Sequence, residues 1–346
     1  MASLVQALFE AGGTPPARAA IVARHLVGAN LAGHESHGII RVPDYLDRVK
    51  RGHIVPGAEW KIDRETPSTL VVDGGWGFGY VVTEEVTARL IEKARTTQVA
   101  AATVYRQGHI GRLAGYTLQA ARAGMIGLIT ADSGRSPKQV APFGGAESRL
   151  GTNPISIAVP SDLDGPLFID IATSAVAGGK VSLALARGQS IPLGWVVDSD
   201  GNQTTDPARL KKGGSLLPLG GPEGHKGYGL AVIVEVLCGL LTGLGFGVEP
   251  TGKHNDGCFV AVFNVEAFRP LHTFTREVAD FARYLKATKP AQGFDEVLYP
   301  GELEHRAQTD REANGVPVDD KLYERLANVS QEYGLAGRFE RLEAVA

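Results

Sequence analysis

Cysteine is scarce in this chain. Only Cys238 and Cys258 occur among 346 residues, and both lie in apolar stretches. A disulfide scaffold would need more cysteines in a regular spacing. We therefore interpret both as buried free thiols of a reducing compartment, and we expect a cytoplasmic protein. The first residues also lack the basic start and the long apolar run of a secretory signal.

An excess of positive charge is missing as well. Lys and Arg total 35 while Asp and Glu total 38, which gives a formal net charge of −3. Nucleic-acid-binding domains and polybasic membrane anchors usually carry a clear basic excess. We therefore expect neither a nucleic acid nor a membrane surface as a partner.

No uninterrupted apolar run has the length of a membrane span. Residues 229–247 come closest, but Glu235 lies near their middle and five glycines interrupt them. A carboxylate inside a bilayer is costly. The segment 226–242 is therefore predicted to be a core helix.

The common nucleotide-binding glycine motifs are absent, although glycine is abundant. The chain has 44 glycines, nearly twice the usual share of about 7%. No GxGxxG follows a predicted strand, and no Walker motif occurs. A nucleotide would have to bind to a fold other than the Rossmann and P-loop folds. GHIGRLAG (108–115) remains of interest, because it joins a predicted strand to a helix N-terminus, a place that favours an anion such as a pyrophosphate.

Hydrophobic periodicity predicts helices at both ends of the chain, with most strands between them. The segment 99–131 has the order strand–helix–strand, which favours parallel pairing of its two strands. The fold class is α/β, or mixed α+β. The predicted helices cover 3–11, 15–31, 42–49, 83–95, 112–123, 226–242, 275–287 and 319–333, and the predicted strands cover 69–73, 99–104, 125–131, 155–159, 167–171, 194–198 and 258–265.

A polar patch, GHESHG (33–38), carries the first candidate site. Arg41 and Tyr45 follow His37 at intervals of four residues, so in a helix the three side chains would share one stripe. A guanidinium binds a carboxylate at two points, and a tyrosine hydroxyl adds a hydrogen bond. The stripe therefore suits a small acid, with a solvated helix face as the alternative.

The same patch permits a second interpretation. Its histidines are spaced HExH, whereas zinc proteases use HExxH. A zinc-dependent hydrolase is kept as an alternative, but we expect no metal.

His109 is the second candidate, because it lies in a glycine loop that directly follows a predicted strand. It is placed like a group that transfers a proton, with a packed core histidine as the alternative. Polar clusters at 152–154 and 170–174 lie at other strand ends, where turn chemistry alone would explain either.

Seven motifs occur together and in order, and the set resembles the type 2 malate/L-lactate dehydrogenase family, most closely its bacterial hydroxycarboxylate dehydrogenase branch. The likeness spans residues 3–335. That family binds NAD or NADP on a fold of its own, in agreement with the missing GxGxxG. The motifs are SHGIIR (36–41), GHIGRLAGY (108–116), APFGG (141–145), GTNPISIAVP (151–160), DIATSAVAGGK (170–180), HKGYGLA (225–231) and PGE (300–302).

The resemblance implies roles for individual residues. His109 matches the proton donor and acceptor at the C2 oxygen of the substrate, and His37 and Arg41 complete the implied catalytic set. Gly108 is a departure, because relatives often carry Ser or His there. The implied substrate-binding residues are Arg41, Tyr45 and Asn153, and the implied cofactor-binding residues are His109, Ile110, Gly111, Arg112, Leu113, Asp170, Ile171, Ala172, Thr173, Ser174, Lys226, Gly227, Gly301 and Glu302.

The resemblance also implies an architecture. Residues 73–265 would form a central NAD(P)-binding domain around a mixed sheet. Residues 1–72 and the returning segment 266–346 would together form a helical substrate domain. The expected assembly is a homodimer.

The reaction implied is hydride transfer between NAD(P) and a small 2-hydroxy acid or its 2-oxo acid. NAD is the expected cofactor and NADP is the alternative. Asp132 would bind the ribose of NAD, whereas Arg135 would bind the extra phosphate of NADP, and the two residues lie close together in the sequence. The runner-up function is reduction of cyclic imino acids such as pyrroline- or piperideine-2-carboxylate, which would keep the carboxylate clamp. A non-catalytic anion-binding module is a further alternative.

Overall fold

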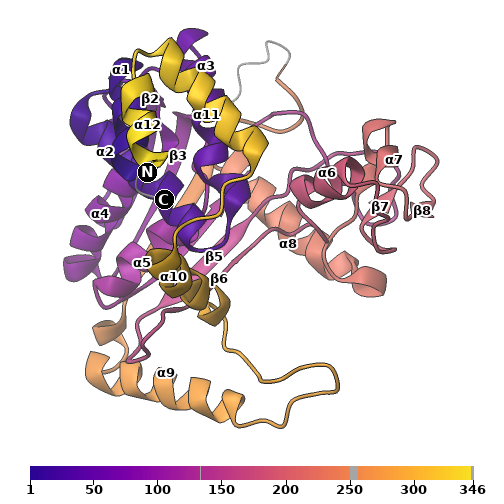
Figure 1. Ribbon diagram of the computed structural model, residues 1–346. Helices are drawn as coiled ribbons and strands as arrows, with labels where there is room; N and C mark the ends of the chain where they lie inside the picture. Colours follow the sequence, from indigo (N-terminus) through magenta and orange to yellow (C-terminus); the bar gives the residue numbers. More distant parts are fainter. Residues whose placement is uncertain (133, 250–255, 344–346) are drawn as a thin grey trace.

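The structure, a computed structural model, describes residues 1–132, 134–249 and 256–343. Helices from the two chain ends gather at one end of the molecule (Figure 1). In this helical layer α10 contacts α2, and α11 contacts α3. The predicted helical part built from both chain ends is thereby confirmed. Its helices are α1 (Ala2–Ala11), α2 (Pro16–Leu31), α3 (Val42–Lys50), α10 (Glu302–Asn314), α11 (Asp320–Glu332) and α12 (Ala336–Glu343).

One hydrophobic core joins this helical layer to the central sheet. Leu8, Val22 and Leu46 of the N-terminal helices are buried in it. They share it with Val72 of the sheet and Leu326 of the C-terminal helices. Burial of these apolar faces holds the two chain ends together.

The central sheet has seven strands in the order β1-β2-β3-β10-β4-β5-β6. β2 and β3 are parallel and are connected by α4 (Gly79–Thr97), whereas the other neighbouring strands are antiparallel. The predicted mixed sheet is confirmed. The strands are β1 (Lys61–Glu65), β2 (Thr69–Gly77), β3 (Val99–Gln107), β4 (Met125–Ala131), β5 (Ile155–Val159), β6 (Leu167–Ile171) and β10 (Cys258–Asn264).

The parallel pairing predicted for the segment 99–131 is wrong. The helix α5 (Ala114–Arg122) does connect β3 to β4, but β10 lies between these strands. Val260 of β10 is paired with Ala102 on one side and Ile129 on the other, antiparallel to both strands. The crossover therefore leaves room for one strand, which a distant part of the chain fills.

A small lobe extends from the sheet and contains α6 and α7 (Figure 1). Its three short strands are arranged β8-β7-β9 around a separate apolar cluster that includes Val140, Val181 and Leu216. Only Val196–Val197 of the predicted strand 194–198 pair as a strand. The elements are α6 (Gly178–Ala186), β7 (Val196–Val197), β8 (Gln203–Thr204), α7 (Ala208–Lys211) and β9 (Ser215–Leu216).

The apolar run at 229–247 forms α8 (His225–Glu235) and a π-helical turn, Val236–Leu240. In the described part of the chain, no helix is long and apolar enough to cross a membrane. The remaining long helix is α9 (Leu271–Lys286). The domain boundaries proposed from the sequence stay predictions.

Candidate active site

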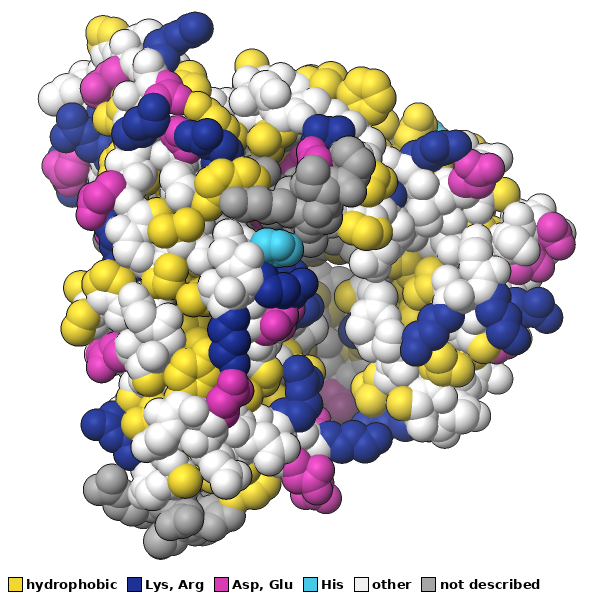
Figure 2. All heavy atoms as spheres, turned by 90° about the horizontal axis from the view of Figure 1, so that it is seen from above, with side chains coloured by type: hydrophobic (Ala, Val, Ile, Leu, Met, Phe, Trp, Pro, Cys, Tyr) yellow, Lys and Arg dark blue, Asp and Glu magenta, His cyan; other side chains and the backbone are white. Residues whose placement is uncertain are grey.

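The two leading candidate segments meet at one cavity of about 360 Å³. The N-terminal segment contributes His37, Arg41 and Tyr45, and the loop after β3 contributes His109. Figure 2 shows the molecule hollowed where the sheet-bearing part meets the small lobe, with Lys and Arg side chains along the hollow. Such a basic border favours a negatively charged ligand.

The predicted stripe of His37, Arg41 and Tyr45 is not one continuous helix. Two 3₁₀ turns, Glu35–His37 and Ile39–Arg41, precede α3. Tyr45 on α3 is buried at 2% exposure, which anchors the helix beside the cavity. All three side chains nevertheless line the same cavity.

The rings of His37 and His109 are stacked, with centroids 5.8 Å apart and planes 19° apart. Burial, together with the nearby positive charge of Arg41, lowers the pKa of His37 to about 4. His37 is therefore neutral at neutral pH. It can exchange a hydrogen bond with a ligand, but it is poorly suited to deliver a proton.

The hydroxyl of Tyr45 lies 2.6 Å from Nδ1 of His109 and 3.2 Å from the hydroxyl of Tyr80. Burial raises the pKa of Tyr45 to about 12, so this hydroxyl stays protonated at neutral pH. The structure thus places Tyr45 against the candidate acid–base group. Its predicted substrate contact stays a prediction.

Two guanidinium groups line the cavity, and sequence reasoning found only one of them. Nε of Arg41 donates to the backbone oxygen of Ser36 at 2.7 Å. Arg48 lies 3.4 Å from the carboxylate of Asp44, and both also line the cavity. Arg48 follows Arg41 by seven residues, a spacing that places two side chains on the same face of a helix. This signal could have identified Arg48 from the sequence.

Two further carboxyl groups line the cavity, those of Asp132 and Asp256. Oδ2 of Asp256 accepts the N–H of Ile110 at 3.2 Å, and burial raises the pKa of Asp256 to about 6. Oδ1 of Asp132 accepts the N–H groups of Gly134 at 2.8 Å and Gly257 at 3.0 Å. Asp256 was missed from the sequence, because nothing local shows that β10 starts beside His109.

The Oδ2 atom of Asp132 is buried and has no hydrogen-bond partner among the described residues. Burial raises the pKa of this carboxyl to about 7, with Glu235 and Asp256 adding repulsion. Arg135 is paired with Glu249 at 3.1 Å. The expected use of NAD stays a prediction.

Asn153 lies behind the cavity wall. Its backbone has φ +38°, and its Nδ2 donates to the backbone oxygen of Ala231 and to Oε2 of Glu235, both at 2.9 Å. The neighbours Thr152 and Pro154 line the cavity. A substrate contact by Asn153 stays a prediction.

The predicted cofactor segment 170–174 is hydrogen-bonded to residues of the cavity wall. The hydroxyl of Thr173 donates to the backbone oxygens of Thr152 at 3.1 Å and Asn153 at 3.0 Å. Oδ2 of Asp170 accepts the N–H of Ala114 at 2.8 Å, at the start of α5. The helix terminus that we expected to attract a pyrophosphate therefore already has a carboxylate at one of its N–H groups.

In the loop after β3, Ile110, Gly111 and Leu113 line the cavity, as the predicted cofactor contacts require. Arg112 instead lies over the ring of Phe168, 5.3 Å from its centroid. Its Nε is buried without a hydrogen-bond partner in the described chain.

The other predicted cofactor residues do not line the cavity. Lys226 is exposed beside Glu223, and a Cβ atom on Gly227 would lie 2.2 Å from the backbone oxygen of Leu219. Gly227 is therefore needed for close backbone packing. The segment Asp170–Ser174 likewise stays outside the cavity lining.

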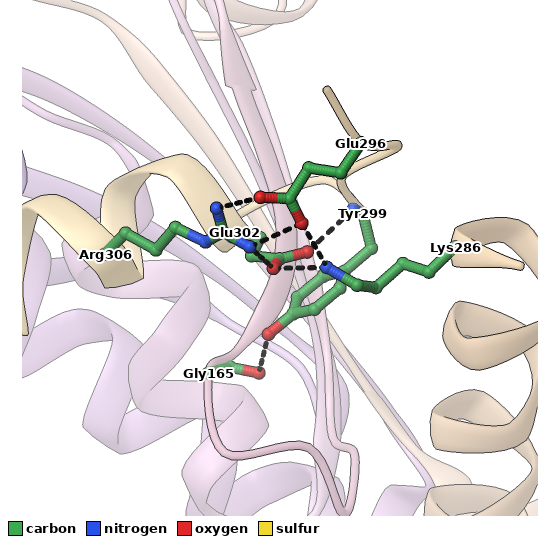
Figure 3. Close-up of polar contacts among 6 residues, drawn as sticks. All are labelled: Gly165, Lys286, Glu296, Tyr299, Glu302 and Arg306. Carbon is green, nitrogen blue, oxygen red and sulfur yellow. Dashed lines mark hydrogen bonds and ion pairs between the residues drawn. The ribbon is translucent and has the colours of Figure 1, made fainter. Parts of the chain in front are cut away.

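Glu302 belongs to a polar cluster at the start of α10 (Figure 3). Its carboxylate binds Lys286 and Arg306 and accepts the N–H of Tyr299 at 3.2 Å. Gly301 has φ +96°, the left-handed conformation in which glycine is favoured. These contacts give both residues a structural role, and their cofactor contacts stay predictions.

The HExH patch is not assembled as a metal centre. Within the described ranges, no group of three or more His, Cys, Asp or Glu side chains is placed to hold a metal ion. His34 faces Glu304 at 3.5 Å, while His37 faces His109.

Several known proteins similar to this chain are dehydrogenases. Residues 1–327 match the family described as malate/L-lactate dehydrogenase. A malate dehydrogenase of Pyrococcus abyssi is 37% identical over 333 residues, which cover 94% of this chain and 91% of the relative. Hydroxycarboxylate dehydrogenase B of Escherichia coli O157:H7 is 34% identical over 340 residues, with 96% and 92% covered.

The fold agrees with this assignment. The crystal structure of malate dehydrogenase from Entamoeba histolytica superposes with a TM-score of 0.92 at 32% identity, covering 96% of each chain. The predicted family and dehydrogenase activity are confirmed, in preference to a zinc hydrolase or an anion-binding module. This chain belongs to the malate/L-lactate dehydrogenase family and is an oxidoreductase that acts on the CH–OH group of a small hydroxy acid.

Proposed function

We propose that the protein transfers a hydride between NAD, with NADP as the alternative, and C2 of a 2-hydroxy or 2-oxo acid. The observation that carries this proposal is the meeting of His37, Arg41 and His109 at one cavity. A cation for the carboxylate and a titratable ring for the C2 oxygen are the two groups that this reaction needs from the protein.

The cavity suits the reacting end of a nicotinamide cofactor. The small residues Ala131 and Gly151 leave room along one wall. The buried Oδ2 of Asp132, which lacks a described partner, would exchange a hydrogen bond with an amide or hydroxyl group of the ligand. When bound, the nicotinamide ring supplies or accepts the hydride.

The protein binds and orients the acid through Arg41, whose planar guanidinium matches a carboxylate at two points. Because Tyr45 engages Nδ1 of His109, the proton exchange with the C2 oxygen falls to Nε2. His37, neutral at neutral pH, contributes a hydrogen bond beside it. A cofactor and an acid that fill the cavity would displace water from the hydride path.

Arg48 favours a substrate with a second anionic group. It lines the same cavity as Arg41, and its ion-pair partner Asp44 is 3.4 Å away. A dicarboxylate such as malate would place one carboxylate on each guanidinium. Lactate would leave Arg48 without a ligand.

The homodimer expected from the resemblance also remains a proposal. The exposed side of α8 and the turn after it carries large apolar side chains, with Ile233 58%, Leu241 57% and Phe246 74% exposed. Apolar surface of this extent is typical of an interface. Sedimentation of the purified protein would test whether it is a dimer. A cytoplasmic location also stays a prediction.

The direct test is the His109→Asn variant assayed in both directions. Loss of general acid–base help lowers rates by about 10²–10⁴-fold. We expect this loss for both the oxo and the hydroxy acid, with the cofactor Kd nearly unchanged. A folded variant that keeps the wild-type kcat and pH dependence would remove His109 from the chemistry.

A substrate panel with NADH and NADPH tests the rest. It should include malate, lactate, their oxo acids and pyrroline-2-carboxylate. Oxidation of the reduced cofactor by the cyclic imino acid alone would favour the runner-up function over the 2-oxo acid reductase.

A further inference from the structure

Behind the cavity, a second tyrosine continues the contacts of His109. The Tyr80 hydroxyl lies 3.2 Å from the Tyr45 hydroxyl, which in turn lies 2.6 Å from Nδ1 of His109. Tyr80 does not line the cavity, and it is only 1% exposed. It therefore has no direct contact with a ligand there.

Tyr80 is held from several sides. It is the second residue of α4, and its ring lies 6.0 Å from the ring of Tyr45 and 5.2 Å from the ring of His25. Gly111, in the loop that carries His109, has φ +66°. A Cβ atom on Gly111 would lie 2.2 Å from the Tyr80 hydroxyl. The loop and Tyr80 are thus fitted to each other, and the missing side chain at Gly111 makes room for the hydroxyl.

Each tyrosine hydroxyl has one hydrogen to donate. Burial raises the pKa of both tyrosines, so both hydroxyls remain protonated at neutral pH. If the Tyr45 hydroxyl donates to Tyr80, its oxygen can only accept a hydrogen bond from Nδ1 of His109, and Nδ1 then carries the ring proton. If Tyr80 donates to Tyr45, then Tyr45 donates to Nδ1, and the ring proton is on Nε2. The two hydroxyls together decide which nitrogen of His109 bears the proton.

We propose that Tyr80 is a positioning residue that acts through Tyr45 to orient the His109 ring and select its tautomer. The proposal rests on the proposed acid–base role of His109. Both hydrogen-bond arrangements keep Nδ1 engaged, so Nε2 can either give or take the proton in the reversible reaction. The other titratable or charged groups around the cavity are His37, Arg41, Asp44, Arg48, Asp132 and Asp256.

The kinetic test uses Tyr80→Phe and Tyr45→Phe, alone and combined. Loss of one neutral hydrogen bond corresponds to roughly 2- to 12-fold. We expect Tyr80→Phe to lower kcat by about that factor in both directions and to shift the pH midpoint. The cofactor Kd and the substrate KM should change little. In the Tyr45→Phe background, the Tyr80→Phe change should have no further effect on kcat or on the midpoint.

Tyr299→Phe is the matched control. It removes a hydroxyl that lies 3.3 Å from the backbone oxygen of Gly165, away from the cavity, on another buried tyrosine. It should leave the pH midpoint unchanged. If Tyr80→Phe lowers kcat equally in the presence and absence of the Tyr45 hydroxyl, Tyr80 does not act through Tyr45, and the proposal is wrong.

A spectroscopic measurement keeps this inference separate from the proposed function. Nitrogen-15 NMR of imidazole-labelled protein reports which ring nitrogen is protonated, and His109→Asn identifies the His109 signals. Tyr80→Phe should change the tautomer ratio or the titration of that ring, whether or not a substrate has been found. Unchanged signals would overturn the role of Tyr80, whereas failure of the substrate panel would affect only the proposed function.

Discussion

Replacing Asp132 by asparagine should stabilise the fold at alkaline pH and do much less in acid. Asp132 is 4% exposed, and its Oδ1 accepts two backbone N–H groups, from Gly134 and Gly257. An asparagine oxygen can keep both hydrogen bonds. The change removes a negative charge that burial disfavours, and burial raises the pKa of this carboxyl to about 7.

The sign and the size follow from proton linkage. An aspartate in the unfolded chain titrates near pH ~3.9. Above that pH the unfolded chain releases the proton that the folded chain still holds, so stability falls as pH rises toward about 7. A difference of about three pKa units, at ~1.4 kcal/mol each, amounts to on the order of 4 kcal/mol at alkaline pH. The asparagine variant lacks this loss.

The assay is urea unfolding of wild type and variant at several pH values, with Asp73→Asn as a control of opposite sign. Asp73 is 1% exposed, and burial alone would raise its pKa, but hydrogen bonds from Arg106 and Gly75 outweigh burial and lower it. Asp73→Asn should therefore lose stability at neutral pH and lose less in acid. If the Asp132→Asn variant shows the same dependence of unfolding free energy on pH as wild type, the Asp132 carboxyl is not held protonated as argued.

Three further changes test the cavity. Arg41→Lys keeps the charge but loses the planar grip, so kcat/KM for 2-oxo acids should fall roughly 10- to 100-fold with an unchanged cofactor Kd; equal activity would point to another carboxylate ligand. Arg48→Gln should lower kcat/KM for malate much more than for lactate, and an equal loss for both would exclude a second anion site. Gly111→Val places a side chain against the Tyr80 hydroxyl, at a residue with a left-handed backbone conformation. Both the melting temperature and kcat should therefore fall. A variant with wild-type values of both would contradict the close fit of the loop.

The parts of the site predicted from the sequence are those marked by local patterns. His37, Arg41 and Tyr45 were found by their spacing, and His109 by its glycine loop. Asp256 gave no such signal, because its position beside Ile110 depends on the insertion of β10 between β3 and β4. That strand order is decided by long-range packing, which periodicity does not report.

The elements missed from the sequence are mostly polar or short. β1 reads Lys-Ile-Asp-Arg-Glu and is largely exposed, so it has no apolar alternation to detect. α10 is similarly rich in charged residues, and only Glu302 of its side chains is buried. β1 is held by its pairing with β2, and the start of α10 is held by the ion pairs of Glu302. Both are tertiary contacts. Local propensity is a weak guide where tertiary contacts select the conformation.

The central position of β10 has a consequence for biosynthesis. The ribosome releases β3 and β4 long before residues 258–264, which pair with both. Until then, each nascent strand has an open edge of the kind that pairs with other chains. A stalled or truncated product that ends before Cys258 should expose both edges at once and depend on chaperones, whereas the completed chain closes the sheet in one step of strand insertion.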